Sequence, residues 1–376
     1  MEFITFILAG GAFFIWTIIL LLPWQPWNIN EIFYAEDSEI DQELKDITVL
    51  IPARNEVAVI KRTLQSVINQ GKGINIILVD DESTDGTADI ARDTVGKSLQ
   101  IIKGQPLPEG WVGKLWALEQ GRKKLNTTYT VLLDADIELG SGVINKMLNH
   151  LNDNNIQFMS LMVTPTMISY WEKLLMPAFV YFFKLLYPFS LANNPISKVA
   201  AAAGGCIFMK TEIFEKIDGY NSIKSELIDD CSLAYQVKLA GYRTWIGLTH
   251  SACSIRSYKK LWDICEMIAR NAFTQLRYSI LLLILISVVM LLAFLIPVLI
   301  LVTSQGGARY FAVGALLIMG LTYLPTLKFY YRSIIWVFNL PLIAFLYLAI
   351  TWYSALRYWC GVRSQWKTRV YRSTTI

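Results

Sequence analysis

Two aspartates, Asp134 and Asp136, stand two positions apart directly after the apolar run 129–133. In an extended segment such side chains point the same way, so both carboxylates can hold one hard cation. A cation held in this way bridges the oxygens of a diphosphate. The pair therefore predicts a Mg²⁺ or Mn²⁺ site that also binds a diphosphate; the alternative is a solvated turn after a strand.

A second acidic pair, Asp229 and Asp230, precedes the helical pattern of residues 233–239. A like-charged neighbour and partial burial raise the pKa of a carboxyl group, which suits a general base. The alternative is a structural role, in which one aspartate caps the helix and the other complements its dipole. The pair alone leaves both interpretations open.

Other candidate ligand-binding residues follow apolar runs or lie in glycine-flanked loops. Asp81 is placed to accept a hydrogen bond from a nucleobase N–H, although Asp80 or Asp85 can equally cap or orient the next helix. Lys114 lies in a glycine-flanked loop, where it can act as a point charge for a diphosphate or be an ordinary exposed lysine. His250 ends an apolar run and is a candidate third metal ligand, with a structural role as the alternative.

The elements that must position these residues follow from hydrophobic periodicity. Short apolar runs rich in β-branched residues predict buried strands at 47–51, 75–79 and 129–133, and periodic segments predict helices after them. Alternating strands and helices indicate a doubly wound α/β domain, which binds its ligands beyond the carboxyl ends of its strands. The acidic residues cluster at those ends, together with the segment 52–56.

The 376-residue chain is 54% apolar and only 17% charged, which excludes an ordinary soluble globule and a disordered chain. Four uncharged stretches are long enough to consider as membrane spans, at 3–22, 280–302, 310–327 and 334–356. Nine basic and no acidic residues lie in 277–376, so the rest of the chain has a net charge of −5. We therefore expect a membrane anchor with cationic rims and no nucleic-acid surface.

The acidic motifs occur in an order that resembles family 2 glycosyltransferases of the GT-A fold over residues 47–278. The motifs are Pro52-Ala-Arg-Asn-Glu56, Asp80-Asp-Glu-Ser-Thr-Asp-Gly-Thr87, Asp134-Ala-Asp136 and Asp229-Asp230. The resemblance implies a nucleotide-sugar site, with Asp81 at the base. The residues expected around the donor are Pro52, Asn55, Glu56, Asp80, Asp81, Lys114 and Asp134. The resemblance also implies that Asp134 and Asp136 hold the metal ion. Asp230, beside Asp229, would deprotonate the acceptor hydroxyl, so that the anomeric configuration inverts.

Further segments narrow the resemblance to the hopene-associated glycosyltransferases of bacterial hopanoid pathways, and more widely to ceramide glucosyltransferases. These segments are 108–118, 200–206, 227–231 and 272–279. They imply a hopanoid or similar membrane lipid as acceptor. One departure is Thr274-x-x-Arg277-Tyr278, where membrane-bound relatives often carry Gln-x-x-Arg-Trp. A cation for the leaving diphosphate is expected in this region, either Arg270 or Arg277.

The segment 169–188 predicts a helix on the acceptor side. Its apolar residues, including Phe179 and Phe182, fall on one broad face, with Lys184 on the opposite side. This pattern is typical of a helix in the membrane interface, and Gly204-Gly205 lets a backbone approach the acceptor. The alternatives are a buried amphipathic helix packed on the sheet and a plain tight turn.

The sequence therefore predicts a membrane-bound inverting glycosyltransferase that moves a sugar, expected to be UDP-linked, to a membrane lipid. The expected parts are a transmembrane anchor (1–27), an acidic linker (28–46), the GT-A domain (47–276) and a C-terminal transmembrane region with a basic tail (277–376). The alternatives are a polyprenyl-phosphate glycosyltransferase and a non-catalytic membrane scaffold of the same fold. Nucleotide-sugars are cytoplasmic, so we expect the inner membrane, with the catalytic domain facing the cytoplasm. Three spans after that domain would put the basic tail outside, against the positive-inside tendency.

Overall fold

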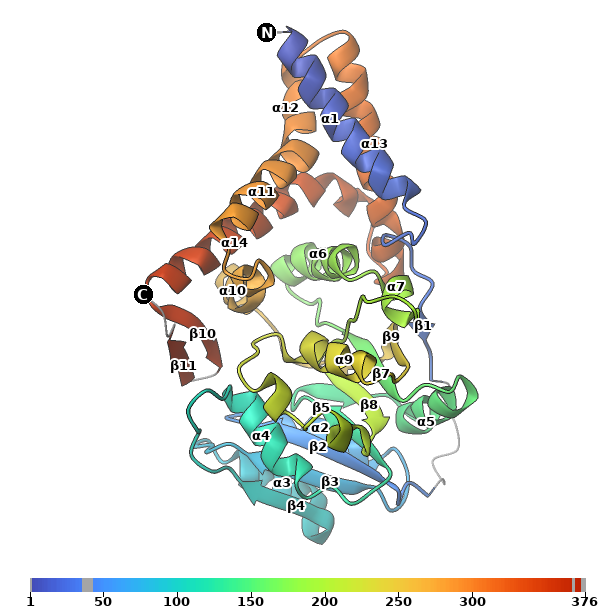
Figure 1. Cartoon of the computed structure of the whole chain (residues 1–376), viewed down its shortest axis with the longest axis vertical. Coiled ribbons are helices and arrows are strands. Elements are labelled where there is room, and N and C mark those ends of the chain that lie inside the picture. The colour runs from blue at the N-terminus through green and yellow to red at the C-terminus, as the bar shows by residue number, and fades with distance from the viewer. Residues whose placement is uncertain (1, 36–42, 367–368, 373–376) are drawn as a thin grey trace.

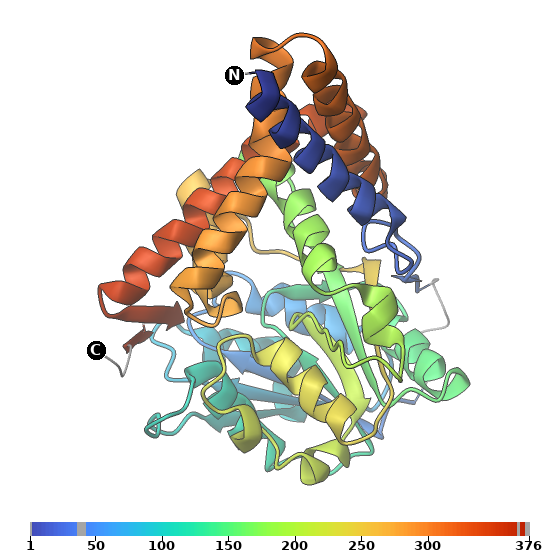
Figure 2. The same cartoon turned by 45° about the horizontal axis from the view of Figure 1, so that its top comes forward.

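The computed structural model describes residues 2–35, 43–366 and 369–372. A mixed α/β domain lies at one end of an elongated molecule and apolar helices lie at the other (Figure 1). Figure 2 shows the same arrangement with the helical end brought forward. Residues 36–42 of the predicted acidic linker and Lys367 of the predicted basic tail lie outside the described residues.

In the described part of the chain, the α/β domain is built on a nine-stranded sheet. Its order is β1-β9-β7-β8-β5-β2-β3-β4, and β6 pairs with β9. The strands are β1 (Ile32–Phe33), β2 (Ile47–Ala53), β3 (Asn75–Asp80), β4 (Leu99–Lys103), β5 (Tyr129–Leu133), β6 (Ile137–Leu139), β7 (Phe158–Thr164), β8 (Cys206–Lys210) and β9 (Thr244–Ser254). The predicted α/β fold is confirmed, with the expected strands found as β2, β3 and β5. The sheet is mixed because β8 runs antiparallel to β5 and β7, and β6 antiparallel to β9.

Alternate residues of the central strands face two separate apolar cores. Val49 and Ile51 of β2 pack on the side of α2 (Ile60–Ile68), α3 (Thr87–Val95) and α5 (Val143–Asp153). Leu50 faces the other side, with α4 (Gly113–Arg122), α8 (Ile213–Lys216) and α9 (Asp229–Leu239). Two short 3₁₀ turns, η1 (Gly96–Ser98) and η2 (Asn221–Ile223), complete this half. Helices cover both faces, which is why the strands are continuously apolar.

Three helices lie between the sheet and the apolar end: α6 (Tyr170–Leu186), α7 (Phe189–Asn193) and α10 (Leu261–Gln275) (Figure 1). A capping box starts α6, since the Ser169 hydroxyl accepts from the Glu172 N–H at 3.2 Å and the Glu172 carboxylate accepts from the Ser169 N–H at 2.7 Å. The prediction that Lys184 lies on an exposed polar face of this helix is wrong. Its side chain is buried and donates to the Asn28 carbonyl at 2.5 Å. A buried ammonium needs such a partner, so this side of α6 is covered by protein.

Among the described residues, four segments are long and apolar enough to cross a membrane: Glu2–Leu21, Ile280–Thr303, Gly307–Phe329 and Ile334–Trp359. They are formed by α1 (Glu2–Leu21), α11 (Ile280–Met290), the π-helical turn η3 (Leu291–Leu295), α12 (Ile296–Thr303), α13 (Gly307–Phe329), the 3₁₀ turn η4 (Ile334–Asn339) and α14 (Leu340–Trp359). A hairpin of β10 (Val362–Trp366) and β11 (Arg369–Arg372) follows. The helix α1 runs beside α13, where a Cβ at Gly314 would lie 2.7 Å from the Phe13 ring. This close approach therefore requires glycine.

Candidate active site

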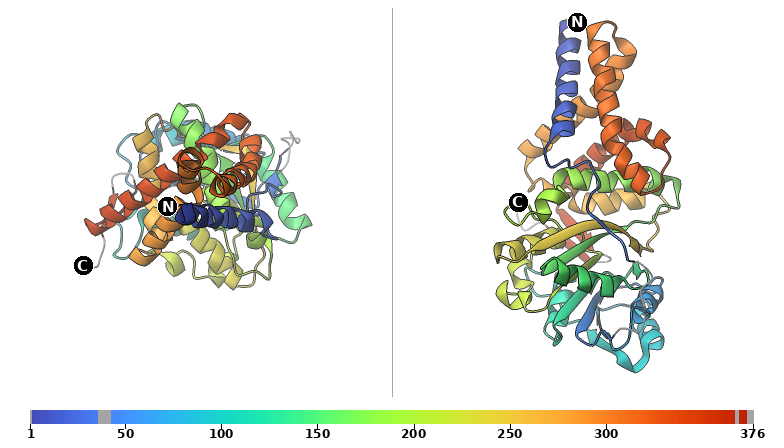
Figure 3. Two further views of the ribbon diagram at one scale, coloured as in Figure 1. Left: turned by 90° about the horizontal axis from the view of Figure 1, so that it is seen from above. Right: turned by 90° about the vertical axis from the view of Figure 1, so that its right-hand side faces the viewer.

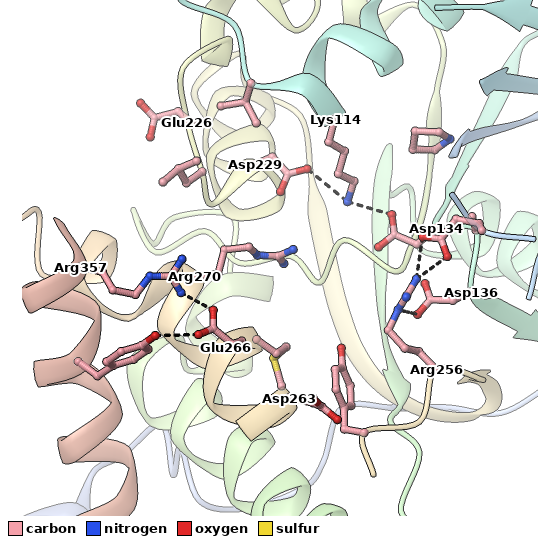
Figure 4. Close-up of a pocket in the computed structure, with 18 residues that line it drawn as sticks. Lys114, Asp134, Asp136, Glu226, Asp229, Arg256, Asp263, Glu266, Arg270 and Arg357 are labelled. Carbon is pink, nitrogen blue, oxygen red and sulfur yellow. Dashed lines mark hydrogen bonds and ion pairs between the residues drawn. The ribbon is translucent and has the colours of Figure 1, made fainter. Parts of the chain in front are cut away.

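A cleft of about 720 Å³ lies between the carboxyl ends of the central strands and two helices from the C-terminal part (Figure 4). Pro52 in β2 and Asp134 after β5 line one wall. Arg270 of α10 and Arg357 of α14 line the other wall. The cleft thus joins residues that are up to 305 positions apart in the chain, from Pro52 to Arg357. It occupies the ligand-binding edge expected of such a sheet.

Lys114 connects the two predicted acidic pairs. Its Nζ lies 2.9 Å from Asp134 Oδ1 and 3.4 Å from Asp229 Oδ2. Burial alone would lower the pKa of Lys114, but the charges of Asp134 and Asp229 outweigh burial and raise that pKa above its ordinary value. The ammonium therefore stays protonated. Burial also raises the pKa of the Asp134 carboxyl, although Lys114 opposes this effect.

Arg256, which belongs to none of the acidic motifs, holds Asp136 in place. Its Nε donates to Asp136 Oδ2 at 2.9 Å, and its terminal nitrogen donates to both oxygens of Glu56 at 2.7 and 2.8 Å. This arginine follows β9, so it stands at the end of a strand like the acidic motifs. Its position directly after a strand would have predicted Arg256 as a site residue, because the end of β9 faces the same ligand site.

Asp230 is partly buried in the first turn of α9, beside Gly204. One carboxylate oxygen accepts from the Gly204 N–H and the other from the Cys231 N–H, each at 2.8 Å. Burial and the neighbouring charge of Asp229 raise the pKa of Asp230 to about 6. A Cβ at Gly204 would lie 3.5 Å from Asp230 Oδ2 and 3.4 Å from Lys114 Nζ, so this backbone position is in van der Waals range of both groups.

The loops after β2 and β3 are tied together on one side of the cleft. Asn55 has φ of +51°, and its side-chain oxygen accepts from the Thr84 N–H at 2.9 Å. Asp81 is completely buried, and its carboxylate lies 3.4 Å from the Arg54 guanidinium. Asp80 accepts from the Ser83 N–H at 3.3 Å. Neither Asp80 nor Asp81 lines the cleft itself, whereas Glu56 does.

Two predicted ligands lie elsewhere. The prediction of His250 as a metal ligand is wrong: its Nδ1 lies 3.2 Å from Thr164 Oγ1 and its Nε2 lies 2.8 Å from the Phe329 carbonyl, in a different cavity. Its ring also stacks on Phe329 at a centroid distance of 4.2 Å. Of the two alternative arginines, Arg270 lines the cleft, while Arg277 is exposed at the end of α10 outside it.

The aromatic residues predicted to contact the acceptor also lie away from the cleft. Phe182 packs in an apolar cluster, with ring centroids 5.9 Å from Phe294 and 5.1 Å from Tyr347. Phe179 belongs to the same cluster and also lies outside the cleft lining. Both side chains therefore pack between α6 and the apolar helices. In this structure neither of them lines the cleft where the acceptor was expected.

Whether a metal ion fits the cleft can be judged from the charged side chains that line it. Among the described residues, seven acidic and four basic side chains line it. The acidic ones are Glu56, Asp134, Asp136, Glu226, Asp229, Asp263 and Glu266, and the basic ones are Lys114, Arg256, Arg270 and Arg357. A diphosphate entering a cleft with this negative excess is repelled unless a cation accompanies it. Two carboxylates with diphosphate oxygens suit Mg²⁺ or Mn²⁺, so Asp134 and Asp136 fit the ion.

The part of the chain that the structure describes contains no group of three His, Cys, Asp or Glu side chains able to hold a metal ion by itself. The ligand set of any ion at Asp134 and Asp136 would therefore have to be completed by other oxygen atoms. Mg²⁺ commonly binds in this way, through one or two carboxylates together with phosphate oxygens and water.

The fold and this site define an α/β domain with a charged cleft at the carboxyl ends of its central strands. Residues 48–218 match the model of the family Glycosyl transferase family 2. The matched segment runs from β2 through β8 and includes Lys114, Asp134 and Asp136. The match covers less than half of the chain, and it is to the same family that the motif order resembles.

Two curated relatives are similar over part of the chain. A 4,4'-diaponeurosporenoate glycosyltransferase of Staphylococcus haemolyticus (strain JCSC1435) is 33% identical over 97 residues, which are 26% of this chain and 26% of that protein. The protein of the same name in Staphylococcus aureus (strain bovine RF122 / ET3-1) is 34% identical over 93 residues, 25% of this chain and 24% of the relative. The chain thus matches about a quarter of the length of these relatives.

A solved structure is similar over almost the whole chain. It is a mannosyltransferase from Pyrobaculum calidifontis in complex with GDP-mannose and Mn²⁺. The TM-score is 0.54 at 17% sequence identity, and the superposition covers 93% of this chain and 99% of that one. At this identity the similarity shows the fold alone.

Proposed function

We propose that this chain is a membrane-bound, metal-dependent glycosyltransferase that moves a sugar from a nucleotide-sugar to a lipid hydroxyl with inversion. The observation that carries the proposal is the ion-pair chain Asp134–Lys114–Asp229 next to the partly buried Asp230. The ion-pair chain lines the cleft whose far wall is α10 and α14, and Asp230 lines a small pocket that shares these three residues with the cleft. A polar donor can enter beside the strand ends, while a lipid can reach the same cleft from the side of the apolar helices.

Asp230 is the proposed general base. Its pKa of about 6 is close to neutral pH, where a base is both ionised and able to take a proton. In the proposed step it accepts the proton of the acceptor hydroxyl while the hydroxyl oxygen forms a bond to the anomeric carbon. The bond from that carbon to the diphosphate breaks on the opposite face. The products are a glycosylated lipid and a nucleoside diphosphate.

The remaining residues of the cleft bind and orient the donor in this proposal. Mg²⁺ or Mn²⁺ bound by Asp134 and Asp136 would supply charge neutralisation for the leaving diphosphate. Lys114 and Arg270 add positive charge from opposite walls of the cleft. Asp81, buried behind the loops, is proposed to recognise the nucleobase, and Arg54 fixes its orientation.

The acceptor is proposed to be a hopanoid or a lipid of similar shape. The hopanoid assignment is supported by the motif resemblance, and a lipid acceptor is also supported by the names of the partial relatives, which act on 4,4'-diaponeurosporenoate. We further propose the inner membrane as location, with the GT-A domain of residues 47–276 in the cytoplasm, because nucleotide-sugars are made there. The anchor 1–27 and the region 277–376 would hold it at the membrane.

The test is an assay on membranes that contain the protein, incubated in turn with radiolabelled UDP- and GDP-sugars and with Mg²⁺ or Mn²⁺. Lipids are then extracted and the labelled product is identified by mass analysis. We expect a lipid whose mass increases by one hexose, formed by the wild type and not by Asp230→Asn. Label in a polyprenyl phosphate would favour that acceptor class, and absence of any labelled product with all donors would contradict the enzymatic proposal.

A further inference from the structure

Both ends of the apolar segment that contains α14 contact helices that lie between the sheet and the apolar end of the molecule, namely α6 and α10. We call the α/β domain together with these two helices the catalytic half. At the start of the segment, the ring of Trp336 in η4 lies 5.7 Å from that of Tyr170, the first residue of α6. At its end, the Arg357 guanidinium is ion-paired with the Glu266 carboxylate of α10. A helix of 20 residues is about 30 Å long, which equals the thickness of the bilayer core. A helix that crossed this core could not return both of its ends to the same domain.

The helix is also fixed to the catalytic half along its length by polar contacts. The Tyr347 hydroxyl donates to the Leu175 carbonyl of α6 at 3.0 Å, and the Ser354 hydroxyl donates to the Ala269 carbonyl of α10 at 2.5 Å. The Tyr353 hydroxyl donates to the Glu266 carboxylate at 2.8 Å. Tyr353 and Arg357 also line the polar cleft. This face of α14 is therefore at the depth of the aqueous site.

The other candidate spans have a different direction. In Figure 1, α1, α12 and α13 extend from the domain toward the far end of the molecule, while α14 runs beneath them toward the C-terminus. The view from above in Figure 3 shows α14 along much of its length. The start of α13 lies beside the start of α1, since a Cβ at Gly307 would be 3.0 Å from the Phe6 ring. The N-terminus and the turn between α12 and α13 thus share the far end.

We propose that α14 lies in the plane of the membrane surface on the catalytic side, and that the chain crosses the bilayer three times. The crossings are α1, the segment Ile280–Thr303 and α13. The C-terminal tail then lies on the same side as the GT-A domain. This proposal concerns the arrangement in the membrane and does not depend on which reaction the cleft performs.

The charges beside the spans agree with this arrangement. Arg277, Lys328 and Arg332 flank the catalytic-side ends of the second and third crossings, and the basic tail follows on that side. Between Thr303 and Tyr310 the sequence holds Arg309 as its one charged residue. Loops rich in lysine and arginine stay in the cytoplasm. With four spans the basic tail would lie on the side of the membrane opposite the catalytic domain, against the positive-inside tendency. With three crossings the basic tail and the catalytic domain lie on the same side.

The face of α14 turned away from the domain is apolar and open to lipid. Leu342, Phe345, Leu356 and Trp359 are 49%, 49%, 53% and 47% exposed, and they recur at helical spacing. In η4 just before the helix, Phe338 is 83% exposed. An apolar stripe opposite a polar face, with tryptophan at its end, fits the boundary between lipid headgroups and acyl chains. We therefore expect this stripe to contact the surface of the bilayer.

Cys360, directly after α14, provides a native probe of the side on which the helix ends, because it is a free and exposed thiol. The half-exposed Cys253 and Cys265 are replaced by serine, and Cys206 and Cys231 stay, since both are buried. In matched controls Cys360 is also replaced by serine, and a cysteine is introduced either as Ser98→Cys in the domain or as Gln305→Cys in the exposed turn between α12 and α13. Each protein is treated with a membrane-impermeant maleimide in sealed vesicles of both orientations.

We expect Cys360 to react in the same vesicle orientation as Ser98→Cys, and in the opposite one to Gln305→Cys. Reaction of Cys360 together with Gln305→Cys would overturn the proposal. A second measurement places nitroxide labels at Leu342→Cys, Ala349→Cys and Leu356→Cys, which are all exposed, and determines their depth by relaxation with oxygen and a nickel chelate. An in-plane helix gives the same shallow depth at all three positions. A deep Ala349 between two shallow positions would refute the in-plane helix.

Discussion

Replacing Asp230 by asparagine removes the proposed base while keeping the shape of the side chain. An amide cannot accept the acceptor proton, so we expect turnover to fall by about 10²–10⁴-fold. This loss corresponds to about 3–5 kcal/mol in the activation barrier. Donor binding should change little, because Asp134, Asp136 and Lys114, which are the proposed ligands of the metal and the diphosphate, are unchanged in this variant.

The effect of the same substitution on folding can be worked out from the structure. The folded carboxyl has its pKa raised from 3.8 to about 6, so above pH 6 its ionised form costs the fold about 3 kcal/mol. This cost disappears as the pH falls from 6 toward 3.8. Asparagine removes the cost at neutral pH, but its single oxygen cannot accept from both Gly204 and Cys231 N–H groups, which costs about 1–3 kcal/mol. The two effects offset each other, so the variant should fold.

The assay is the initial rate of glycolipid formation between pH 5 and 8, with thermal unfolding in detergent and donor affinity measured on the same preparations. For the wild type, kcat/KM should fall as the pH drops through about 6, with about one-tenth of the plateau left at pH 5. The variant should lose this acid limb along with its activity. Asp93→Asn, an exposed change on α3, is the matched control. Activity of Asp230→Asn within a few-fold of wild type, or an unchanged acid limb, would refute the assignment.

Three further outcomes are expected. Asp136→Ala should abolish metal-dependent donor binding in calorimetry, and EDTA should stop the wild-type enzyme until Mg²⁺ or Mn²⁺ is added; full activity after exhaustive chelation would reject the metal. Arg270→Gln should slow turnover by about 10²-fold through loss of a cation near the leaving diphosphate, while the matched Arg277→Gln outside the cleft stays near wild type; equal effects would contradict the choice between them. Arg256→Ala should lower the unfolding free energy by about 3 kcal/mol, because it leaves the carboxylates of Glu56 and Asp136 without their shared partner; an unchanged melting temperature would show that the pairing contributes nothing.

The local parts of this site could be predicted from the sequence. Asp134, Asp136 and Glu56 each follow an apolar strand within a few residues, and the ends of neighbouring strands must meet at one edge of the sheet. Asp230 and Lys114 each stand at the start of a helix, close to a strand in space. Such positions are fixed by short-range patterns, which is why the sequence predicts that these residues lie close together at one edge of the sheet.

The partners of these residues could not be predicted in the same way. Arg256 pairs with Glu56 across 200 positions and with Asp136 across 120, and no local periodicity encodes such pairs. Lys184 matched a solvent-facing position on a helical wheel, yet the segment after α1 covers it and supplies the Asn28 carbonyl. His250 follows a run of apolar residues and was therefore a candidate ligand, but it lies inside β9, and α13 places Phe329 against its ring. In each case a distant element decided the environment.

The two walls of the cleft therefore have different origins. The wall with Asp134 and Lys114 belongs to the GT-A domain, whose family match covers residues 48–218. The opposite wall belongs to α10 and α14, and the position of α14 depends on contacts such as that between Arg357 and Glu266. The curated relatives match this chain over about a quarter of their length, so these matches alone do not assign the acceptor of those proteins to this chain.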